Sequence, residues 1–201
     1  MKLVQALQCF NRKERFWLIK KALGGKSETF DRKFINSLDG ELSIKVPKNA
    51  WWAMDYHLDW LRESLMKTLE HDIINADRLK NGVSQSAEEE KCEKLIRRKV
   101  QDIDLILVFE DNATTHIILI EAKGVTGWKN RQLVSKANRL KDIFGEAGTY
   151  FEKVTPHFVT TSPTRPSDRV KTGKFPNWMK NDKGKLRWIP LSIPSDLEAE
   201  K

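Results

Sequence analysis

Two nearly continuous runs of apolar residues, separated by four turn-forming residues, constrain this chain more than any other feature. Residues 102–110 read Asp-Ile-Asp-Leu-Ile-Leu-Val-Phe-Glu, and residues 115–123 read Thr-His-Ile-Ile-Leu-Ile-Glu-Ala-Lys. The intervening Asp-Asn-Ala-Thr supplies turn chemistry, so the two runs predict an antiparallel hairpin. Because neither run alternates strictly between apolar and polar residues, both strands are expected to be covered on both faces, in the middle of a sheet.

The segments around this hairpin predict mostly helices before it and a mixture of helix and strand after it. Helices are expected at residues 3–10, 11–24, 27–38, 54–69 and 130–144, and a turn at 39–40. A polar segment at 81–93 is expected to form a loop or a short, poorly packed helix, and short strands are expected at 42–46, 156–161 and 186–193. In residues 54–69, apolar side chains recur every three or four positions, which makes one buried stripe. This order of elements predicts an α/β sandwich around a mixed sheet.

Length and composition place the chain among globular proteins. Its 201 residues suffice for one domain with a helical extension. No apolar run approaches the roughly 20 residues that cross a bilayer, and the first residues are too polar for a secretory signal. Cys9 and Cys92 lie far apart, without further ligands at metal-binding spacing. We therefore expect a cytoplasmic protein with no membrane association, no zinc site and no disulfide framework.

The net charge of +8 is unevenly distributed. Residues 1–26 hold seven basic side chains against one acidic side chain, and residues 164–187 hold eight against two. Each of these segments therefore carries about +6, which leaves the remainder mildly acidic. Basic ends around an acidic middle are typical of a protein that binds a polyanion and holds carboxylates at its centre. A lysine-rich surface in contact with solvent only is the alternative explanation.

Acidic residues interrupt the apolar strands where charge is costly. Residues two apart in a strand point to the same side, so Glu121 and Lys123 should share one face at the end of the second run. Asp104 lies within the first run and is followed by aliphatic residues. Charges buried among aliphatic side chains cost several kcal/mol unless they are paired or bind a metal. Two carboxylates and a lysine that meet across a hairpin would suit a hard cation such as Mg²⁺.

This pattern resembles the PD-(D/E)xK phosphodiesterase superfamily. The resemblance lies in Asp-Ile-Asp-Leu, then Ile-Leu-Ile-Glu-Ala-Lys, then a helix with Gln132, over roughly residues 100–161, and Ile103 stands where the motif has its proline. It implies a restriction-endonuclease-like mixed β-sheet flanked by helices. Residues 1–93 would form a helical N-terminal part packed on the core, residues 94–194 the nuclease core, and residues 195–201 a frayed tail.

The resemblance also implies a mechanism and a set of site residues. Asp104, Glu121 and the backbone carbonyl of Ala122 would ligate Mg²⁺, for which Mn²⁺ could substitute. Lys123 would activate the attacking water and stabilise the charge that develops on the phosphate, and Gln132 would contact the site from the following helix. An acid on a preceding helix is also expected from the resemblance, with Asp59 as our choice.

Alternatives to Asp59 remain open. Glu14 is another acid on a preceding helix, but it could merely close a capping box at the start of that helix. Asp59 could equally belong to an acidic stripe that faces solvent, together with Asp55 and Glu63. Asp102, which shares a face with Asp104, is a further candidate for the metal site, as an alternative ligand or as a residue that supports the ligands.

Several residues around this motif are candidates for nucleic-acid binding. Lys136 and Arg139 follow Gln132 at helical spacing, and Trp128 lies just after Gly127. Lys174 and Trp178 belong to a loop that mixes aromatic and basic residues, which is typical of nucleic-acid-facing loops. Core packing is the more common use of tryptophan, and the helix face could be merely solvated.

Other catalytic motifs do not fit this chain. Gly24-Gly25-Lys26-Ser27 lacks the earlier glycine and the preceding strand of a phosphate-binding loop, and the four histidines suggest no ligand pair. Two hypotheses remain. The first is a Mg²⁺-dependent nuclease acting on DNA, in which a homodimer would be in keeping with duplex-cutting relatives. The second is a catalytically silent DNA-binding or assembly module that retains the nuclease fold.

Overall fold

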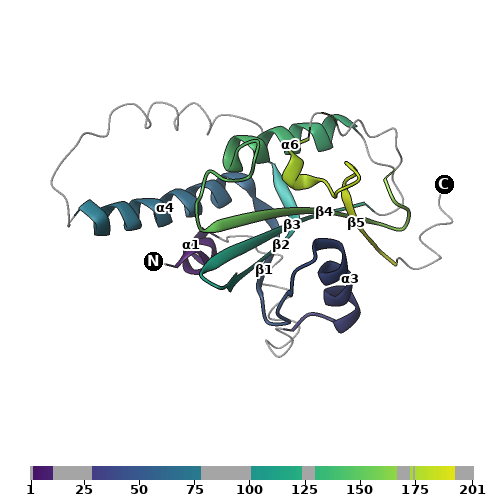
Figure 1. Cartoon of the computed structure of the whole chain (residues 1–201), viewed down its shortest axis with the longest axis horizontal. Coiled ribbons are helices and arrows are strands. Elements are labelled where there is room, and N and C mark those ends of the chain that lie inside the picture. The colour runs from purple at the N-terminus through teal and green to yellow at the C-terminus, as the bar shows by residue number, and fades with distance from the viewer. Residues whose placement is uncertain are drawn as a thin grey trace.

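The computed structural model describes residues 2–10, 29–77, 101–123, 130–166, 173 and 175–192, except for the side chains of residues 8–10, 69–77 and 130. Its centre is a five-stranded mixed sheet with the strands in the order β1-β2-β3-β4-β5. Helices cover both faces of the sheet (Figure 1). The expected α/β class with a mixed sheet is therefore confirmed.

The sheet combines an antiparallel half with a parallel half. Strands β1 (Trp51–His57), β2 (Asp102–Asp111) and β3 (Thr114–Ala122) pair antiparallel, whereas β4 (Val154–Ser162) and β5 (Arg187–Pro190) continue the sheet parallel to β3. Because β3, β4 and β5 run in the same direction, their carboxyl ends share one edge of the sheet.

The predicted hairpin of β2 and β3 is confirmed. Register pairs Asp111 with Thr114, which leaves Asn112 and Ala113 as a two-residue turn. Both have positive φ angles, 47° and 64° respectively. Two left-handed residues in succession match the right-handed twist of the flanking strands. Both strands lie in the sheet interior, as their apolar runs predicted.

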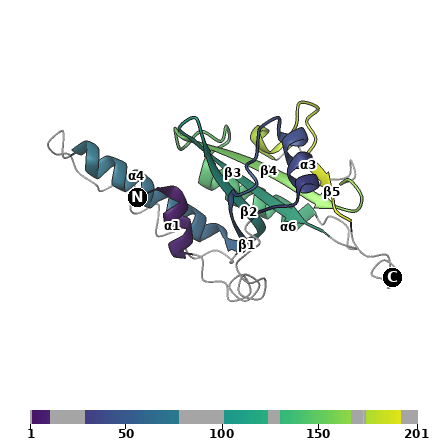
Figure 2. The ribbon, with the colours of Figure 1, turned by 90° about the horizontal axis from the view of Figure 1, so that it is seen from below.

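Among the described residues, three helices cover one face of the sheet and one helix covers the other. Helices α1 (Leu3–Phe10), α4 (Leu58–Asp77) and α6 (Asn130–Phe144) enclose the larger core, whereas α3 (Arg32–Leu42) lies over the opposite face (Figures 1 and 2). Helix α6 has the predicted bounds and ends at Gly145, whose φ is +83°. Its buried stripe contains Leu133, Ala137 and Leu140.

The expectations for residues 27–69 need correction. Helix α3 begins after its N-cap Asp31 and continues through the expected turn at 39–40 to Leu42, so the strand expected at 42–46 is absent. Residues 51–57 form β1 rather than the start of a helix. Its aromatic and apolar side chains pair with β2, and this tertiary contact overrides the helical spacing of Met54. The predicted stripe of Leu58, Leu61 and Leu65 is correct within α4.

The remaining expectations are confirmed only in part or cannot be compared. The strand expected at 156–161 is β4, two residues longer at its start, and the strand expected at 186–193 is the shorter β5. A 3-10 helix, η2 (Asn177–Met179), precedes β5. The helix expected at 11–24, the loop at 81–93 and the tail at 195–201 lie outside the described residues. No helix in the described ranges has the length and apolar character needed to cross a membrane.

Candidate functional site

The hairpin brings the two predicted acids face to face. The β2–β3 register ends at Leu105 opposite Ile120, so the next position brings Asp104 opposite Glu121. Here the Asp104 side chain takes the place of a backbone partner, because its Oδ2 accepts a hydrogen bond of 2.7 Å from the backbone N–H of Ala122. The carboxylate of Asp104 is thereby tied to the strand end that carries Glu121 and Lys123.

A local distortion of β1 accompanies this arrangement. Asp55, whose φ is +48°, lies between the residues that pair with Leu105 and Ile103, and is therefore opposite Asp104. Ile103 and Ile106 both lie in the larger core although they are three positions apart. Regular alternation would place them on opposite faces. The distortion therefore changes the direction of the side chains at the point where Asp104 leaves the β2–β3 ladder.

Glu121 is a buried carboxylate at the end of an apolar strand. Ile117 and Leu119 pack into the larger core, and alternation directs Glu121 to this same face, beneath α6. Its exposed fraction is 6%. Burial raises the pKa of the Glu121 carboxyl, the ammonium of Lys136 opposes this shift, and the nearby charge of Asp104 adds to it. A buried carboxylate beside a second carboxylate needs positive charge close by.

Two lysines supply this positive charge. The Nζ of Lys123 lies 3.9 Å from Oε1 of Glu121, which is an ion pair but too long for a hydrogen bond. Lys136, from the second turn of α6, donates a hydrogen bond to the other oxygen, Oε2. We call Asp104, Glu121, Lys123 and Lys136 the strand-end cluster.

Helix α6 positions Lys136 through its packing. Leu133, Ala137 and Leu140 bury one stripe of the helix against the sheet. Lys136 lies at the border of this stripe, where its methylene groups can be buried while its ammonium reaches Glu121. Only 12% of the Lys136 side chain is exposed, against 26% for Lys123. Lys136 was expected to face phosphates, and its contact with Glu121 was not predicted.

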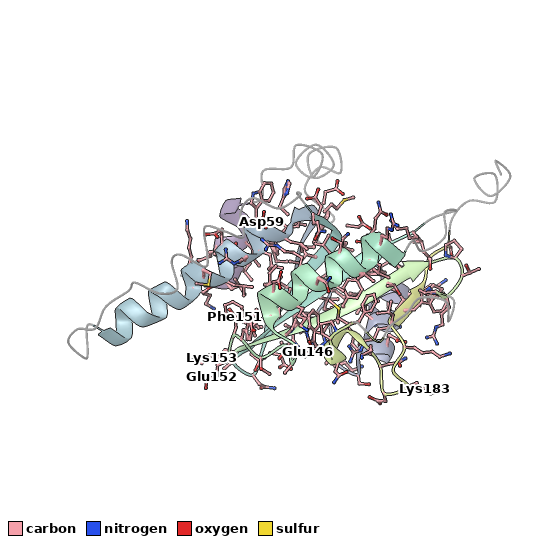
Figure 3. The ribbon with its side chains drawn as sticks, turned by 90° about the horizontal axis from the view of Figure 1, so that it is seen from above. Asp59, Glu146, Phe151, Glu152, Lys153 and Lys183 are labelled. Carbon is pink, nitrogen blue, oxygen red and sulfur yellow. The ribbon has the colours of Figure 1, made fainter. Side chains whose placement is uncertain are left out.

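A second layer of polar contacts joins α4 and α6 beside this cluster. Arg139 of α6 forms an ion pair with Asp59 in the first turn of α4, and Figure 3 shows Asp59 at the start of that helix. The Arg139 side chain is only 8% exposed. Its Nη1 has no hydrogen-bond partner within the described part of the chain. Asp59, the predicted helix acid, therefore lies next to the α6 face that carries Lys136, with Arg139 as its direct partner.

Asp102 and Gln101 extend this layer to the start of β2. The Nδ1 of His57 lies 2.9 Å from Oδ1 of Asp102, its register partner across β1 and β2. Gln101 donates a hydrogen bond of 2.6 Å to the hydroxyl of Ser135 on α6. Asp102 thus has a histidine as its partner.

The other predicted helix and loop residues have varied positions. Gln132 lies one helical turn before Lys136, and its side chain is exposed. Trp178 donates a hydrogen bond of 3.1 Å to the carbonyl of Gly145 and packs against Phe144, so its ring closes the core beneath η2. Trp128 and Lys174 lie outside the described residues.

Trp188, one of the tryptophans that the sequence places near the proposed site or in the basic loop, belongs to the same edge. The parallel register aligns Glu121 with Thr160 and Thr160 with Trp188, in one row across three strands. With strands about 4.8 Å apart, Trp188 lies roughly 10 Å from Glu121. Its indole N–H donates to the hydroxyl of Ser162, and the guanidinium of Arg165 lies 5.3 Å from the ring centroid. Trp188 is partly exposed.

Two histidines pair on the opposite face of the sheet. Nδ1 of His116 and Nε2 of His157 are 3.0 Å apart, across the neighbouring strands β3 and β4. His116 also stacks on Phe109, which belongs to the core beneath α3. Burial, together with the charges of His116 and Arg187, lowers the pKa of His157 to about 4. The sequence spacing had suggested no histidine pair, because the contact depends on the strand register.

A surface hollow of about 470 Å³ lies away from Asp104 and Glu121. Its lining includes Leu3 of α1, Leu65 of α4, Glu110 of β2 and the segment Phe151–Val154 that leads into β4. Glu110 adjoins the turn of the β2–β3 hairpin, at the opposite end of the hairpin from Glu121. The candidate site is the strand-end cluster, because a buried carboxylate meets a second carboxylate and two ammonium groups there.

The donor atoms of the cluster fit a hard cation. Asp104 and Glu121 offer carboxylate oxygens, and Ala122 adds a backbone carbonyl on the same strand end. Within the described ranges, no three or more His, Cys, Asp or Glu side chains gather to hold a metal. Mg²⁺ does not require such a set, because it is commonly held by one or two carboxylates together with water and substrate phosphate.

Comparisons with known proteins add no relative. No family model matches the chain, and neither the curated proteins nor the solved structures contain a match.

Proposed function

We propose that this protein is a metal-dependent phosphodiesterase that hydrolyses nucleic acid, with DNA as its substrate, by chemistry of the PD-(D/E)xK type. One observation carries the proposal: Asp104 and Glu121 from neighbouring strands meet beside Lys123, and Glu121 is almost completely buried. A protein without catalytic or metal chemistry has little use for two carboxylates held this close in an apolar setting.

Asp104, Glu121 and the carbonyl of Ala122 would hold the cation, Mg²⁺ or Mn²⁺. When bound there, it would lower the pKa of a ligated water and withdraw charge from the phosphate. Both carboxylates are held by contacts of the chain itself, so the donors are ordered in advance. Asp104 is oriented by the N–H of Ala122 and Glu121 by its lysine partners.

Lys123 would orient the attacking water and stabilise negative charge on the phosphate. Its ammonium is 3.9 Å from Glu121 and 26% of its side chain is exposed, so it can reach a bound substrate. Arg139 would supply a further cation for a phosphate, because one of its guanidinium nitrogens has no partner within the described residues. Gln132, exposed at the start of α6, would contact the same strand of nucleic acid.

The charge distribution supports a polyanionic substrate. Exposed Lys183 and Lys185 occupy a tight turn before β5, which is held by hydrogen bonds from their backbone N–H groups to the side chain of Asn181. Such cations bind the backbone phosphates of nucleic acid without sequence preference.

A second copy of the chain would supply the second active site that is needed to cut both strands of a duplex. The cysteine usage suits the cytoplasm.

The test is a cleavage assay with plasmid and single-stranded DNA in Mg²⁺, Mn²⁺ or EDTA. We expect cleavage by the wild type that requires the cation, and a loss of about 10²-fold or more in Lys123→Met, because charge on the phosphate is no longer stabilised. Lys45→Met is the matched control, since Lys45 is 94% exposed and belongs to the segment after α3. It should cleave like the wild type.

Two results would argue against this proposal. Absence of cation-dependent cleavage of any DNA would remove the catalytic assignment. If the wild type and Lys123→Met were equally inactive and both bound DNA, the non-catalytic binding module would be favoured instead.

Trp188 provides a separate prediction about substrate binding. Its partly exposed indole, fixed by Ser162 in the same row as Glu121, can stack on a base of a strand that passes the site. Trp188→Ala should weaken binding of a fluorescently labelled single-stranded oligonucleotide, measured by anisotropy in EDTA, by roughly 1–3 kcal/mol. Trp188→Phe keeps an aromatic ring and should lose much less. Equal affinity of the alanine variant and the wild type would exclude this role.

A further inference from the structure

We propose that Lys136 is the internal counter-ion of the strand-end cluster, and that a divalent cation must displace its ammonium from Glu121 in order to bind. Lys136 would thereby set the cation affinity of the site as a positioning residue. This inference rests on the proposed function, because it assumes that the cation occupies the cluster. It goes further by assigning to a helix residue the control of metal loading.

The contacts single out Lys136 from the other cations nearby. Lys136 hydrogen-bonds directly to Oε2 of Glu121, whereas the ammonium of Lys123 is 3.9 Å from the other oxygen. The Lys136 side chain is 12% exposed and the Glu121 side chain is 8% exposed, so water screens this pair weakly. Arg139 is directed to Asp59 instead. Within the part of the chain that the structure describes, Lys136 is therefore the main neutralising charge of the buried carboxylate.

The same contacts create competition with a cation. Oδ2 of Asp104 accepts the N–H of Ala122, and Oε2 of Glu121 accepts from Lys136. A cation held by both carboxylates would lie within a few ångströms of the Lys136 ammonium. The two positive charges would repel each other strongly, because they are close together and little water screens them. The ammonium therefore has to leave before the cation can be held by Glu121.

A lysine is suited to this exchange. Its charge is carried on a flexible stem, so the ammonium can move away from Glu121 while α6 stays in place. The helix itself is held by Leu133, Ala137 and Leu140, whose apolar side chains pack into the larger core. Removal of the ammonium should thus change cation affinity without repacking the helix.

The experiment measures Mn²⁺ binding to the full chain by calorimetry or electron paramagnetic resonance, without nucleic acid, at about pH 8 where ordinary carboxyl groups are ionised. We expect Lys136→Met to bind Mn²⁺ at least tenfold more tightly than the wild type. Lys136→Arg keeps the charge and should bind within about threefold of the wild type. Lys141→Met is the matched control, because it removes one exposed ion-paired lysine from the same helix. Its affinity should be unchanged.

Each remaining outcome decides between the two proposals. If folded Lys136→Met binds Mn²⁺ no more tightly than the wild type, the counter-ion role is wrong, while Mn²⁺ binding by the wild type still supports the proposed function. If no variant binds Mn²⁺, both proposals fail. If Lys136→Met unfolds without metal, the competition predicts that Mn²⁺ restores its circular dichroism spectrum, and failure to do so overturns the inference.

Discussion

Replacing Asp104 with Asn is expected to lower the rate of DNA cleavage by on the order of 10³-fold, while the protein stays folded. The carboxamide oxygen can still accept the hydrogen bond from the N–H of Ala122, so the strand end keeps its geometry. The substitution also removes the charge that adds to the raised pKa of the neighbouring Glu121. Cleavage rates and thermal melting of the same preparations would check both halves of the prediction.

The contrast with Asp104→Ala separates chemistry from structure. Alanine also removes the charge but leaves the Ala122 N–H without its partner, which should cost about 1 kcal/mol of folding free energy relative to Asn. Both variants should be equally inactive. If Asp104→Asn retained cleavage near the wild-type rate, Asp104 would not ligate the catalytic cation.

The second prediction with a large effect concerns the pH dependence of folding. Burial lowers the pKa of His157 to about 4 from the ordinary value of 6.5, so the unfolded chain binds this proton more readily than the folded chain. The stability should therefore be complete above about pH 6.5 and fall as the pH drops towards 4, by about 3 kcal/mol in total for this group. Urea denaturation at a series of pH values would measure it.

The comparison with His157→Gln isolates this contribution. Glu121 acts in the opposite direction, because its raised pKa makes the folded state bind its proton more readily as the pH falls. His116, whose pKa is also lowered by burial, acts in the same direction as His157 and feels the charge of Asp111. Arg187 lies near enough to His157 to oppose its protonation. The variant should lose most of the decline between pH 6.5 and 4; an unchanged decline would show that other groups cause it.

The sequence predicted best the elements whose signal is local. The bounds of α6 and the β2–β3 hairpin follow from periodicity and turn residues within about fifteen positions. The helix expected from Met54 onward was wrong in its first turn because the pairing of β1 with β2 joins residues about fifty positions apart. Periodicity within a segment contains no information on that partner.

Some features of the candidate site follow from neighbouring residues in the sequence, and others depend on distant segments. The common face of Glu121 and Lys123 follows from the two-residue repeat of a strand. The alignment of Trp188 with Glu121 could not be derived in this way, because it depends on the parallel register of β3, β4 and β5. The pairing of Asp59 with Arg139 likewise depends on how α4 and α6 approach each other.

By itself, the sequence determined the buried stripe of α6, the place where the hairpin turns, and that two acids and a lysine would lie in an apolar strand region. Those properties follow from the chemistry of neighbouring residues along the chain. Only the tertiary structure decided that Lys136 neutralises Glu121 and that His116 meets His157 across two parallel strands. Such contacts form only when distant segments pack together, so they depend on the assembled core and not on neighbouring residues in the sequence.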